Sequence, residues 1–364
     1  MTQAQAYDQF PPQIDYETLI VDIIKAHDAL GKLNGLLVNI PNLDLLISPL
    51  LTKEAVLSSK IEGTQAGVED VYRYEAEGKT SENSEHEKDV KEIINYRKAI
   101  NTALKDLQQN PINLALIKNT HNILLDSVRG SQKNKGQLRQ SQVYIGMPGS
   151  NIDQALYIPP THDRLNQLLT QWESYLNDEQ AEKDPIVQIG LAHYQFEAIH
   201  PFLDGNGRIG RLIIPLFLYY KKLLPYPLLY VSEYFETNRQ NYYANLRKVD
   251  QVYDWEAWLK YFLEAITSQA LKTQKTALMI ISLYHNLKDQ ITSFSSAYAI
   301  KLLDIIFETP MVSFVSIKKR LKTKSNQTIY NLIDKFVEAG ILKESSDKKR
   351  NRIYVFRQLI DIIK

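Results

Sequence analysis

One segment near the middle of the chain combines residue types that could handle phosphate. It runs His200-Pro-Phe-Leu-Asp-Gly-Asn-Gly-Arg-Ile-Gly-Arg211. The residues from Arg208 to Tyr220 have helical spacing, so the turn Gly205-Asn-Gly207 lies at a helix N-terminus. Backbone N–H groups and the helix dipole favour an anion at such a position. Because His200 can also take up a proton near neutral pH, the segment supplies a base beside an anion nest.

Three charged side chains complete this candidate site. Asp204 is a hard oxygen ligand of the kind that Mg²⁺ prefers when phosphates share the ion, and it could also cap the helix. Arg208 and Arg211 are three residues apart on one helix face, where two guanidinium groups suit the oxygens of a polyphosphate. Nucleotidyl transfer requires these parts. The alternatives are a plain turn for the segment, a core position for Phe202 and a surface ion pair for Arg211.

The segment resembles the signature H-x-F-x-(D/E)-G-N-G-R-x-x-R of the Fic family of protein adenylyltransferases, with every fixed position present. The resemblance implies an all-α core at about Leu114–Ser268 with a short β-hairpin flap over the nucleotide. It also implies transfer of AMP from ATP to a Ser, Thr or Tyr hydroxyl of a target protein, with release of pyrophosphate. In that reaction His200 would be the catalytic base, Phe202 would anchor the loop, and Asp204 would hold Mg²⁺ between the α- and β-phosphates.

The resemblance also assigns residues to the nucleotide. Asn206 and the loop amides would hold the α-phosphate, and Arg208 and Arg211 would hold the β- and γ-phosphates. ATP and Mg²⁺ are the expected cofactors. The expected nucleotide-site residues are Glu62, Leu156, Tyr157, Asp204, Gly205, Asn206, Gly207, Arg208, Ile209, Gly210, Arg211 and Tyr242.

A second segment, Ser58-Ser-Lys-Ile-Glu62-Gly63, resembles the inhibitory-helix motif (S/T)-x-x-x-E-(G/N) of the same family. Ser58 and Glu62 are four residues apart and share one helix face, and Gly63 is placed to end the helix. The resemblance implies that Glu62 pairs with Arg211, which then cannot hold the γ-phosphate. The alternative is an exposed Glu followed by a capping Gly.

The predicted flap covers Gln142–Pro160. Its second arm, Ala155–Pro160, resembles the family edge strand that aligns a target segment by strand addition. Pro159 and Pro160 end this strand, since neither can donate a hydrogen bond to a ladder. A plain hairpin is the alternative. Tyr242 resembles an aromatic residue that borders the nucleotide base in relatives, and core packing is the alternative for it.

The C-terminal part differs in charge from the rest. Residues 311–364 contain thirteen Lys or Arg and five Asp or Glu, whereas the whole chain contains 43 and 42. We predict a short helix at Ser316–Lys322, a helix at Ser325–Ala339 that Gly340 ends, and a two-stranded wing that includes Ile353–Phe356. The pattern is similar to winged helix-turn-helix domains. Such domains bind DNA phosphates or dock proteins, and both roles are open.

The whole sequence predicts a mainly α-helical protein with more than one module. Its 364 residues exceed the usual domain size of about 100–150, and its apolar spacing is mostly helical. We expect an N-terminal helical region at 1–110, a Fic catalytic domain at 111–290 and a winged-helix domain at 291–364. A polar loop is predicted at Glu75–Asp89, and short strands are predicted at Gln142–Ile145 and Ala155–Ile158.

Composition excludes several classes of protein. Cys is absent, which excludes disulfide scaffolds, thiolate zinc sites and cysteine nucleophiles. A formal net charge of +1 excludes a uniformly basic nucleic-acid coat. Without a leader-like segment or a long apolar run, we expect a cytoplasmic protein that does not enter a membrane.

The expected partners are a target protein, the chain itself as a substrate, DNA through residues 295–364, and a second copy in a homodimer. The alternatives to AMP transfer are a nucleotide-sensing DNA-binding regulator and an enzyme that removes AMP from modified proteins.

Overall fold

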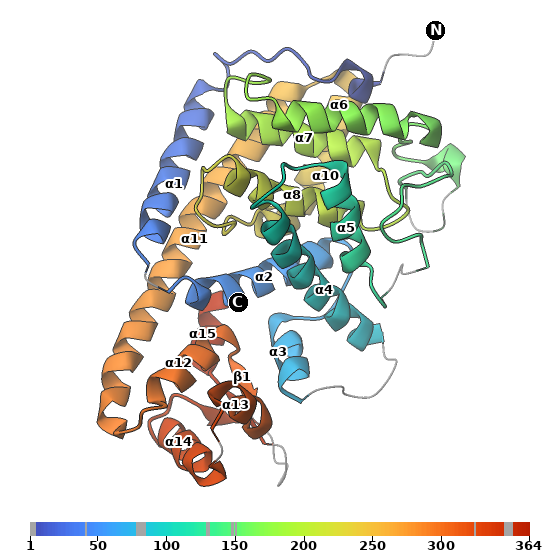
Figure 1. Cartoon of the computed structure of the whole chain (residues 1–364). Coiled ribbons are helices and arrows are strands. Elements are labelled where there is room, and N and C mark those ends of the chain that lie inside the picture. The colour runs from blue at the N-terminus through green and yellow to red at the C-terminus, as the bar shows by residue number, and fades with distance from the viewer. Residues whose placement is uncertain are drawn as a thin grey trace.

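The structure is a computed structural model that describes residues 5–40, 42–77, 85–128, 132–146, 149, 151–323, 325–345 and 352–364. It is mainly helical, which confirms the predicted fold class. Figure 1 shows a larger upper body of helices with the C-terminal elements below it, and α2 crossing between the two.

The N-terminal region contains a short 3-10 helix followed by four α-helices. They are η1 (Ala6–Gln9), α1 (Ile20–Val38), α2 (Asp44–Ile61), α3 (Val68–Glu77) and α4 (Glu85–Asp106). The predicted loop at Glu75–Asp89 is shorter than expected, because both of its ends are helical. Glu and Lys are good helix formers, so their polarity does not by itself end a helix. Residues 78–84 of that prediction lie outside the described residues.

The central region is built around two buried helices, α7 and α8, which pack against each other. Its elements are α5 (Leu114–Leu124), η2 (Ile152–Gln154), η3 (His162–Arg164), α6 (Leu165–Asn177), α7 (Pro185–Ile199), α8 (Asn206–Tyr220), α9 (Ser232–Thr237) and α10 (Arg239–Val252). Asp184 caps α7 by accepting from the backbone N–H groups of Ile186 and Val187 at 2.9 and 3.1 Å. Pro185 follows as the first helical residue, where its missing N–H does no harm.

One long helix, α11 (Trp255–Ile291), connects the upper body to the C-terminal elements. It packs along α1 and extends to the lower elements, as the left side of Figure 1 shows. The elements that follow are η4 (Thr292–Phe294), α12 (Ala299–Glu308), β1 (Met311–Ser313), α13 (Phe314–Leu321), α14 (Asn326–Glu338), β2 (Lys343–Glu344), β3 (Ile353–Val355) and α15 (Arg357–Ile363).

The C-terminal strands form a small antiparallel sheet in the order β1-β3-β2. Met311 and Lys343 both pair with Val355, one from each side of β3. Ser325 caps α14 by accepting from the backbone N–H of Thr328 at 3.2 Å, and Gly340 follows the helix with φ +70°. Sequence reasoning did not predict β1, because a segment of three residues, Met-Val-Ser, directly before a helix is too short to show the alternation of a strand.

The predicted flap strands at Gln142–Ile145 and Ala155–Ile158 are not regular strands among the described residues. A single antiparallel bridge joins Ile145 to Tyr157. The helix η2 occupies the chain immediately before Ala155, and Pro159 and Pro160 remove the next donors, so little length is left for a ladder. Residues 147, 148 and 150 of the predicted flap lie outside the described residues.

The helix that carries the second motif, α2, has neighbours on both sides. It contacts α4, α8 and α9 in the upper body, and α12 and α15 in the C-terminal part. Ser48 in α2 donates to the backbone carbonyl of Glu308 at 2.6 Å. None of the described helices combines the length and apolarity needed to span a lipid bilayer.

Candidate active site

The loop between α7 and α8 is held closed by its own side chains. The Asn206 amide accepts from the backbone N–H of Phe202 at 2.8 Å and donates to its carbonyl at 2.9 Å. Phe202 is fully buried and stacks on the His121 ring with 3.8 Å between ring centroids. The Asn206 side chain was expected to hold the α-phosphate, but in this structure both its polar atoms serve the loop.

His121 fixes the opposite side of the same loop. Its Nδ1 accepts from the backbone N–H of Gly136 at 2.8 Å, so Nε2 carries the proton and donates to the carbonyl of Asp204 at 2.9 Å. Burial lowers the pKa of His121 to about 4, which keeps this ring neutral. Gly205 follows at φ +79°, a conformation that favours glycine, and a Cβ there would lie 3.5 Å from the His121 ring.

His200 ends α7 in a left-handed conformation, with φ 48° and ψ 61°. Burial lowers its pKa to about 4; the nearby Arg139 acts in the same direction, and Glu62 and Asp204 oppose it. The ring is therefore neutral at neutral pH. Its Nδ1 is buried and has no hydrogen-bond partner among the described residues. A neutral imidazole can accept a proton, as a general base must.

Charged groups gather at the N-terminus of α8. One Asp204 oxygen lies 3.1 Å from the Lys133 ammonium, and the other lies 3.2 Å from the Arg208 guanidinium. Arg208 also pairs with Glu92 of α4 at 2.9 Å, and both of these side chains are buried. Arg208 is thus already bound to two carboxylates at the place where we expected it to hold phosphate.

Arg211 lies one turn further along α8 and contacts α2. Its Nε donates to the Ser58 hydroxyl at 3.0 Å, and its Nη2 donates to the Ser58 carbonyl at 2.8 Å and to Glu62 Oε1 at 2.7 Å. The Arg211 side chain is 1% exposed and that of Glu62 is 33% exposed. Burial raises the pKa of Glu62, but the positive charges of Arg211 and Arg208 outweigh this effect and lower it overall. The pairing expected between Glu62 and Arg211 is present.

Glycines allow α2 and α8 to approach at this contact. A Cβ on Gly207 would lie 2.3 Å from Glu62 Oε1 and 2.8 Å from Arg211 Nη1, so a larger residue there would have to displace the ends of these two side chains. The Glu62 carboxylate therefore lies directly on the first turn of α8, where the helix dipole favours a negative charge. Gly63 has φ +100° and follows the end of α2, as the motif predicted.

Other residues expected in the nucleotide site are buried near the contact between Glu62 and Arg211. Ile209 is fully buried, and a Cβ on Gly210 would meet the Glu197 carboxyl. Tyr242 is 1% exposed, stacks on Phe235, and shares a hydrogen bond of 2.9 Å with His193, which corresponds to the core-packing alternative.

The expected flap residues lie beyond His200. Leu156 is 51% exposed, and the Tyr157 hydroxyl donates to the carbonyl of Ala198 in α7 at 2.9 Å. The structure therefore attaches the flap to the helix that ends at His200.

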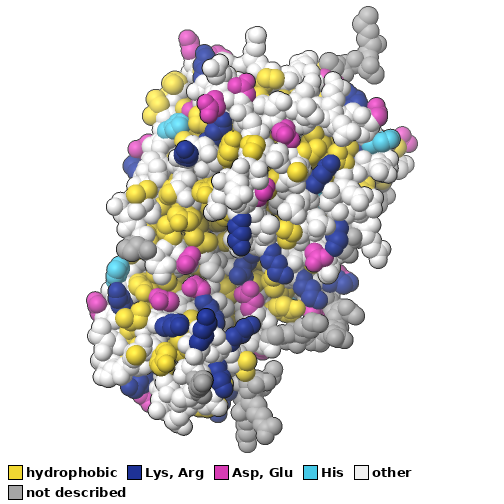
Figure 2. Space-filling model, in the orientation of Figure 1, with side chains coloured by type: hydrophobic (Ala, Val, Ile, Leu, Met, Phe, Trp, Pro, Cys, Tyr) yellow, Lys and Arg dark blue, Asp and Glu magenta, His cyan; other side chains and the backbone are white. Residues whose placement is uncertain are grey.

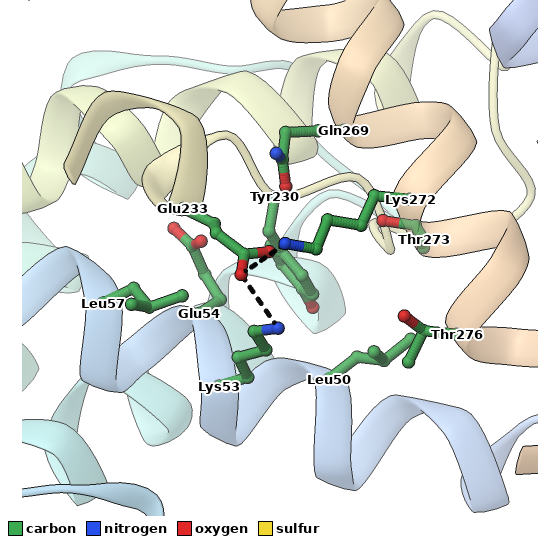
Figure 3. Close-up of a pocket in the computed structure, with 10 residues that line it drawn as sticks. All are labelled: Leu50, Lys53, Glu54, Leu57, Tyr230, Glu233, Gln269, Lys272, Thr273 and Thr276. Atoms are coloured by element: carbon green, nitrogen blue, oxygen red, sulfur yellow. Dashed lines mark ion pairs between the residues drawn. The ribbon is translucent and has the colours of Figure 1, made fainter. Parts of the chain in front are cut away.

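A cavity of about 30 Å³ next to α2 shows how this helix is held against its neighbours. Figure 3 shows the Glu233 carboxylate of α9 between the ammonium groups of Lys53 in α2 and Lys272 in α11, at 3.1 and 2.8 Å. The buried Glu54 accepts from the hydroxyls of Tyr96 and Ser232. Burial raises the pKa of Glu54 to about 7. The same α2 face that reaches Arg211 is thus fixed by polar contacts one turn earlier.

Sequence reasoning missed several residues of the site. His121, Arg139, Lys133, Glu92 and Glu197 all contact or border the loop, yet they belong to no motif. Residue type was the only available signal, because four of these contacts join the loop to a separate part of the chain, and Glu197, although it lies close to His200 in sequence, falls outside the motif.

The carboxylates of the site bear on whether it can hold a metal ion. Among the described residues, no group of three or more His, Cys, Asp or Glu could hold a metal ion. Mg²⁺ does not require such a cage, since it is often held by one or two carboxylates together with substrate phosphates. Asp204 is 28% exposed, and among the described residues its carboxylate pairs with the cations Lys133 and Arg208, so a divalent cation bound with phosphates fits this position.

Two family domains match the chain. Residues 20–105 match the Fic/DOC family N-terminal domain, and residues 111–218 match the Fic/DOC family domain. Together these matches cover more than half of the sequence.

Curated relatives match a shorter part. The protein adenylyltransferase Fic of Drosophila grimshawi is 36% identical over 121 residues, which is 32% of this chain and 22% of the relative. The protein of the same name from Aedes aegypti is 40% identical over 80 residues, which is 22% of this chain and 14% of the relative. The matches thus span less than a quarter of the length of these relatives.

Solved structures share the fold. A Fic family protein from Desulfovibrio desulfuricans G20 has a TM-score of 0.60 at 19% identity, covering 95% of this chain and 98% of the other. A Fic domain containing signaling protein from Bacteroides thetaiotaomicron VPI-5482 has a TM-score of 0.56 at 17% identity, covering 71% of this chain and 96% of the other. At these identities the likeness concerns the fold alone.

Proposed function

Because this chain belongs to the Fic/DOC family, we propose that it transfers AMP from ATP to a Ser, Thr or Tyr hydroxyl of a target protein. One observation carries the proposal: His200, which is neutral at neutral pH, lies at the start of a loop that leads into the N-terminus of α8. The name protein adenylyltransferase, which the curated relatives carry, supports the same reaction class.

In the proposed reaction, one residue acts as the base and the others bind the phosphates of ATP. His200 accepts the proton of the attacking hydroxyl, whose oxygen forms a bond to the α-phosphorus as the bond to pyrophosphate breaks. The backbone N–H groups of Gly205, Asn206 and Gly207 face the α-phosphate at the helix N-terminus. Arg208 and Arg211 hold the leaving pyrophosphate, where charge develops. Bound Mg²⁺, held by Asp204, would neutralise phosphate charge.

We propose that Glu62 keeps the enzyme in an inhibited state. Its carboxylate occupies the first turn of α8 and binds the guanidinium of Arg211, so both the anion position and one cation are taken. ATP must displace this carboxylate to seat its γ-phosphate on Arg211. Release of Glu62 would therefore activate transfer.

ATP labelled at the α-phosphate or at the γ-phosphate separates this function from its alternatives. Transfer of AMP incorporates the α-label into protein and not the γ-label, and self-modification would label the chain itself. A nucleotide-sensing regulator incorporates neither label, which would contradict the proposal. Loss of α-label from a pre-labelled protein after ATP is removed would identify AMP removal instead. Light scattering of the purified chain tests the expected homodimer, and a single-chain mass would contradict it.

A second candidate function concerns the C-terminal elements. We propose that residues 295–364 form a winged helix-turn-helix that binds DNA phosphates. Lys318, Lys319 and Lys322 are exposed on and beside α13, and Gln327 and Asn331 are exposed on α14. Figure 2 shows Lys and Arg side chains on the lower part of the molecule, where Figure 1 places these helices.

The DNA proposal is tested with the full chain and a duplex. With about four to six phosphate contacts, the logarithm of the binding constant should fall with that of the salt concentration with a slope of about −4 to −5. The variant Lys318→Glu/Lys322→Glu should bind more weakly, whereas the exposed but remote Lys32→Glu should not change binding. Absence of binding in dilute salt would favour a protein-docking role.

A further inference from the structure

Arg139 is a buried cation whose guanidinium hydrogen bonds, among the described residues, all go to backbone oxygens. Its side chain is 2% exposed. The guanidinium donates to the carbonyls of His200 at 2.9 Å, Ser141 at 3.1 Å and Ile199 at 3.4 Å, and also to that of Pro160. Its backbone N–H donates to the carbonyl of Pro201 at 3.0 Å.

These carbonyls belong to two segments that the fold must hold together. Residues 199–201 end α7 and contain His200, whereas Ser141 and Pro160 flank the flap at its two ends. One side chain thus joins the loop of the base to both ends of the flap. Two further hydrogen bonds hold the flap: the Tyr157 hydroxyl donates to the carbonyl of Ala198 in α7, and the Gln142 amide donates to the carbonyl of Pro159 within the flap.

The arrangement is energetically unusual. Burying a guanidinium is unfavourable unless its charge is compensated, and burial lowers the pKa of Arg139. Among the described residues, no carboxylate lies within ion-pair distance of it. Carbonyl dipoles from the four backbone positions compensate the charge instead. Keeping a buried guanidinium without a carboxylate partner is unfavourable for stability, which is typical of a residue that is needed for the geometry of a functional site.

His200 itself needs this support. A positive φ is unfavourable for a residue with a side chain, and such conformations persist only where the surroundings fix them. The hydrogen bond from Arg139 Nε to the His200 carbonyl fixes the peptide that follows the base. Rotation of that peptide would swing the imidazole away from the N-terminus of α8.

We propose that Arg139 is a positioning residue that sets the distance and angle between the His200 base and a target segment lying along the flap. The inference rests on the proposed AMP transfer, since it assigns a role in that reaction to a residue outside the motif. A hydroxyl presented by the flap then meets the imidazole in one fixed geometry. Misplacement by about 1 Å is enough to reduce a rate about a hundredfold.

Arg139 also has an electrostatic effect that a purely structural residue would lack. Burial and four groups act on the His200 ring: burial and Arg139 lower its pKa, whereas the Glu197 carbonyl, Glu62 and Asp204 raise it. Removal of the guanidinium should therefore raise the pKa of His200. The acid limb of the pH–rate profile would move to higher pH, because the base becomes protonated sooner as pH falls.

The test compares Arg139→Met and Arg139→Lys in a Glu62→Gly background, with α-labelled ATP. Arg139→Met should lower kcat by about ten- to a hundredfold, leave KM for ATP within about twofold, and move the acid limb upward. Arg139→Lys retains the charge but reaches fewer carbonyls, so it should lower kcat less and leave the acid limb in place. Arg164→Met is the control, since Arg164 pairs with Asp8 and donates to neither segment; its kinetics should equal those of the parent.

Hydrogen exchange tests the role of Arg139 independently of whether the protein transfers AMP. The backbone N–H groups of Ile145, Leu156 and Tyr157 are hydrogen-bonded in the flap and should exchange faster in Arg139→Lys than in the parent. Unchanged kcat and acid limb in Arg139→Met would overturn the proposal. If no variant transfers AMP, or if Arg139→Met does not fold, unchanged exchange of these three groups in Arg139→Lys would overturn it.

Discussion

Replacing Glu62 by Gly should activate the enzyme. The substitution removes one charge-assisted hydrogen bond of 2.7 Å to a guanidinium that is 1% exposed. Such a contact contributes about 1.5–3 kcal/mol. If ATP must break it to seat the γ-phosphate, the barrier to productive binding falls by the same amount, which corresponds to about a ten- to hundredfold faster transfer.

Two related substitutions, Ser58→Ala and Glu62→Gln, should activate the protein to a smaller extent. Ser58→Ala removes only the acceptor for Arg211 Nε, and the Ser58 carbonyl and Glu62 still bind Nη2. Ser58→Ala should therefore activate more weakly than Glu62→Gly. Glu62→Gln keeps an acceptor but loses the charge, so its activation should be intermediate.

The assay is incorporation of α-labelled ATP into protein by wild type, Glu62→Gly and Glu62→Gly/Arg211→Ala. Glu62→Gly should be active and the double variant should lose that gain, because Arg211 is the group that Glu62 blocks. Equal incorporation by wild type and Glu62→Gly would refute the inhibitory role and leave the ion pair as a structural contact.

Three further substitutions test other parts of the site. His200→Ala should lower the rate of AMP transfer by about 10²–10⁴ while ATP binding persists, and retained activity in this variant would contradict the role of His200 as the base. In the parent protein the rate should stay level between about pH 8 and about pH 6, since the pKa of His200 is about 4. Asn206→Ala leaves two buried backbone groups of Phe202 unpaired and should lower the free energy of unfolding, measured with urea, by about 2–4 kcal/mol. A loss of stability smaller than that caused by replacing an exposed Asn with Ala would contradict the loop-closing role of Asn206. Burial raises the pKa of Glu54 to about 7, so the folded form holds this proton and wild-type stability should fall as pH rises from about 4.5 to about 7. Glu54→Gln should remove that dependence and be more stable by up to roughly 3 kcal/mol at about pH 8, as urea unfolding at several pH values would measure.

Local spacing explains what the sequence predicted well. The four-residue separation of Ser58 and Glu62 puts both on one helix face, and both contact Arg211 in the structure. The glycines after Asp204 predicted a tight turn into a helix, and α8 begins at Asn206. In both cases the local conformation, a shared helix face or a turn into a helix, is determined by residues a few positions apart, so the spacing of residue types is enough to predict it.

Long-range contacts explain what the sequence did not predict. Arg139 reaches carbonyls about 20 and 60 positions away, and His121 of α5 stacks on Phe202 in the loop between α7 and α8. No periodicity reports such contacts. The Asn206 amide is a different case, since its neighbours are local, but a ligand role and a loop-closing role require the same residue type. The flap failed as a strand because Pro159 and Pro160 leave few donors for pairing.

The most direct test of AMP transfer is the intact mass of the Glu62→Gly chain after incubation with ATP and Mg²⁺. The chain, or an added target protein, should gain the mass of one or more adenylyl groups, and Glu62→Gly/His200→Ala should gain none. An unchanged mass for both proteins, or an equal gain in the His200→Ala variant, would contradict the proposed reaction.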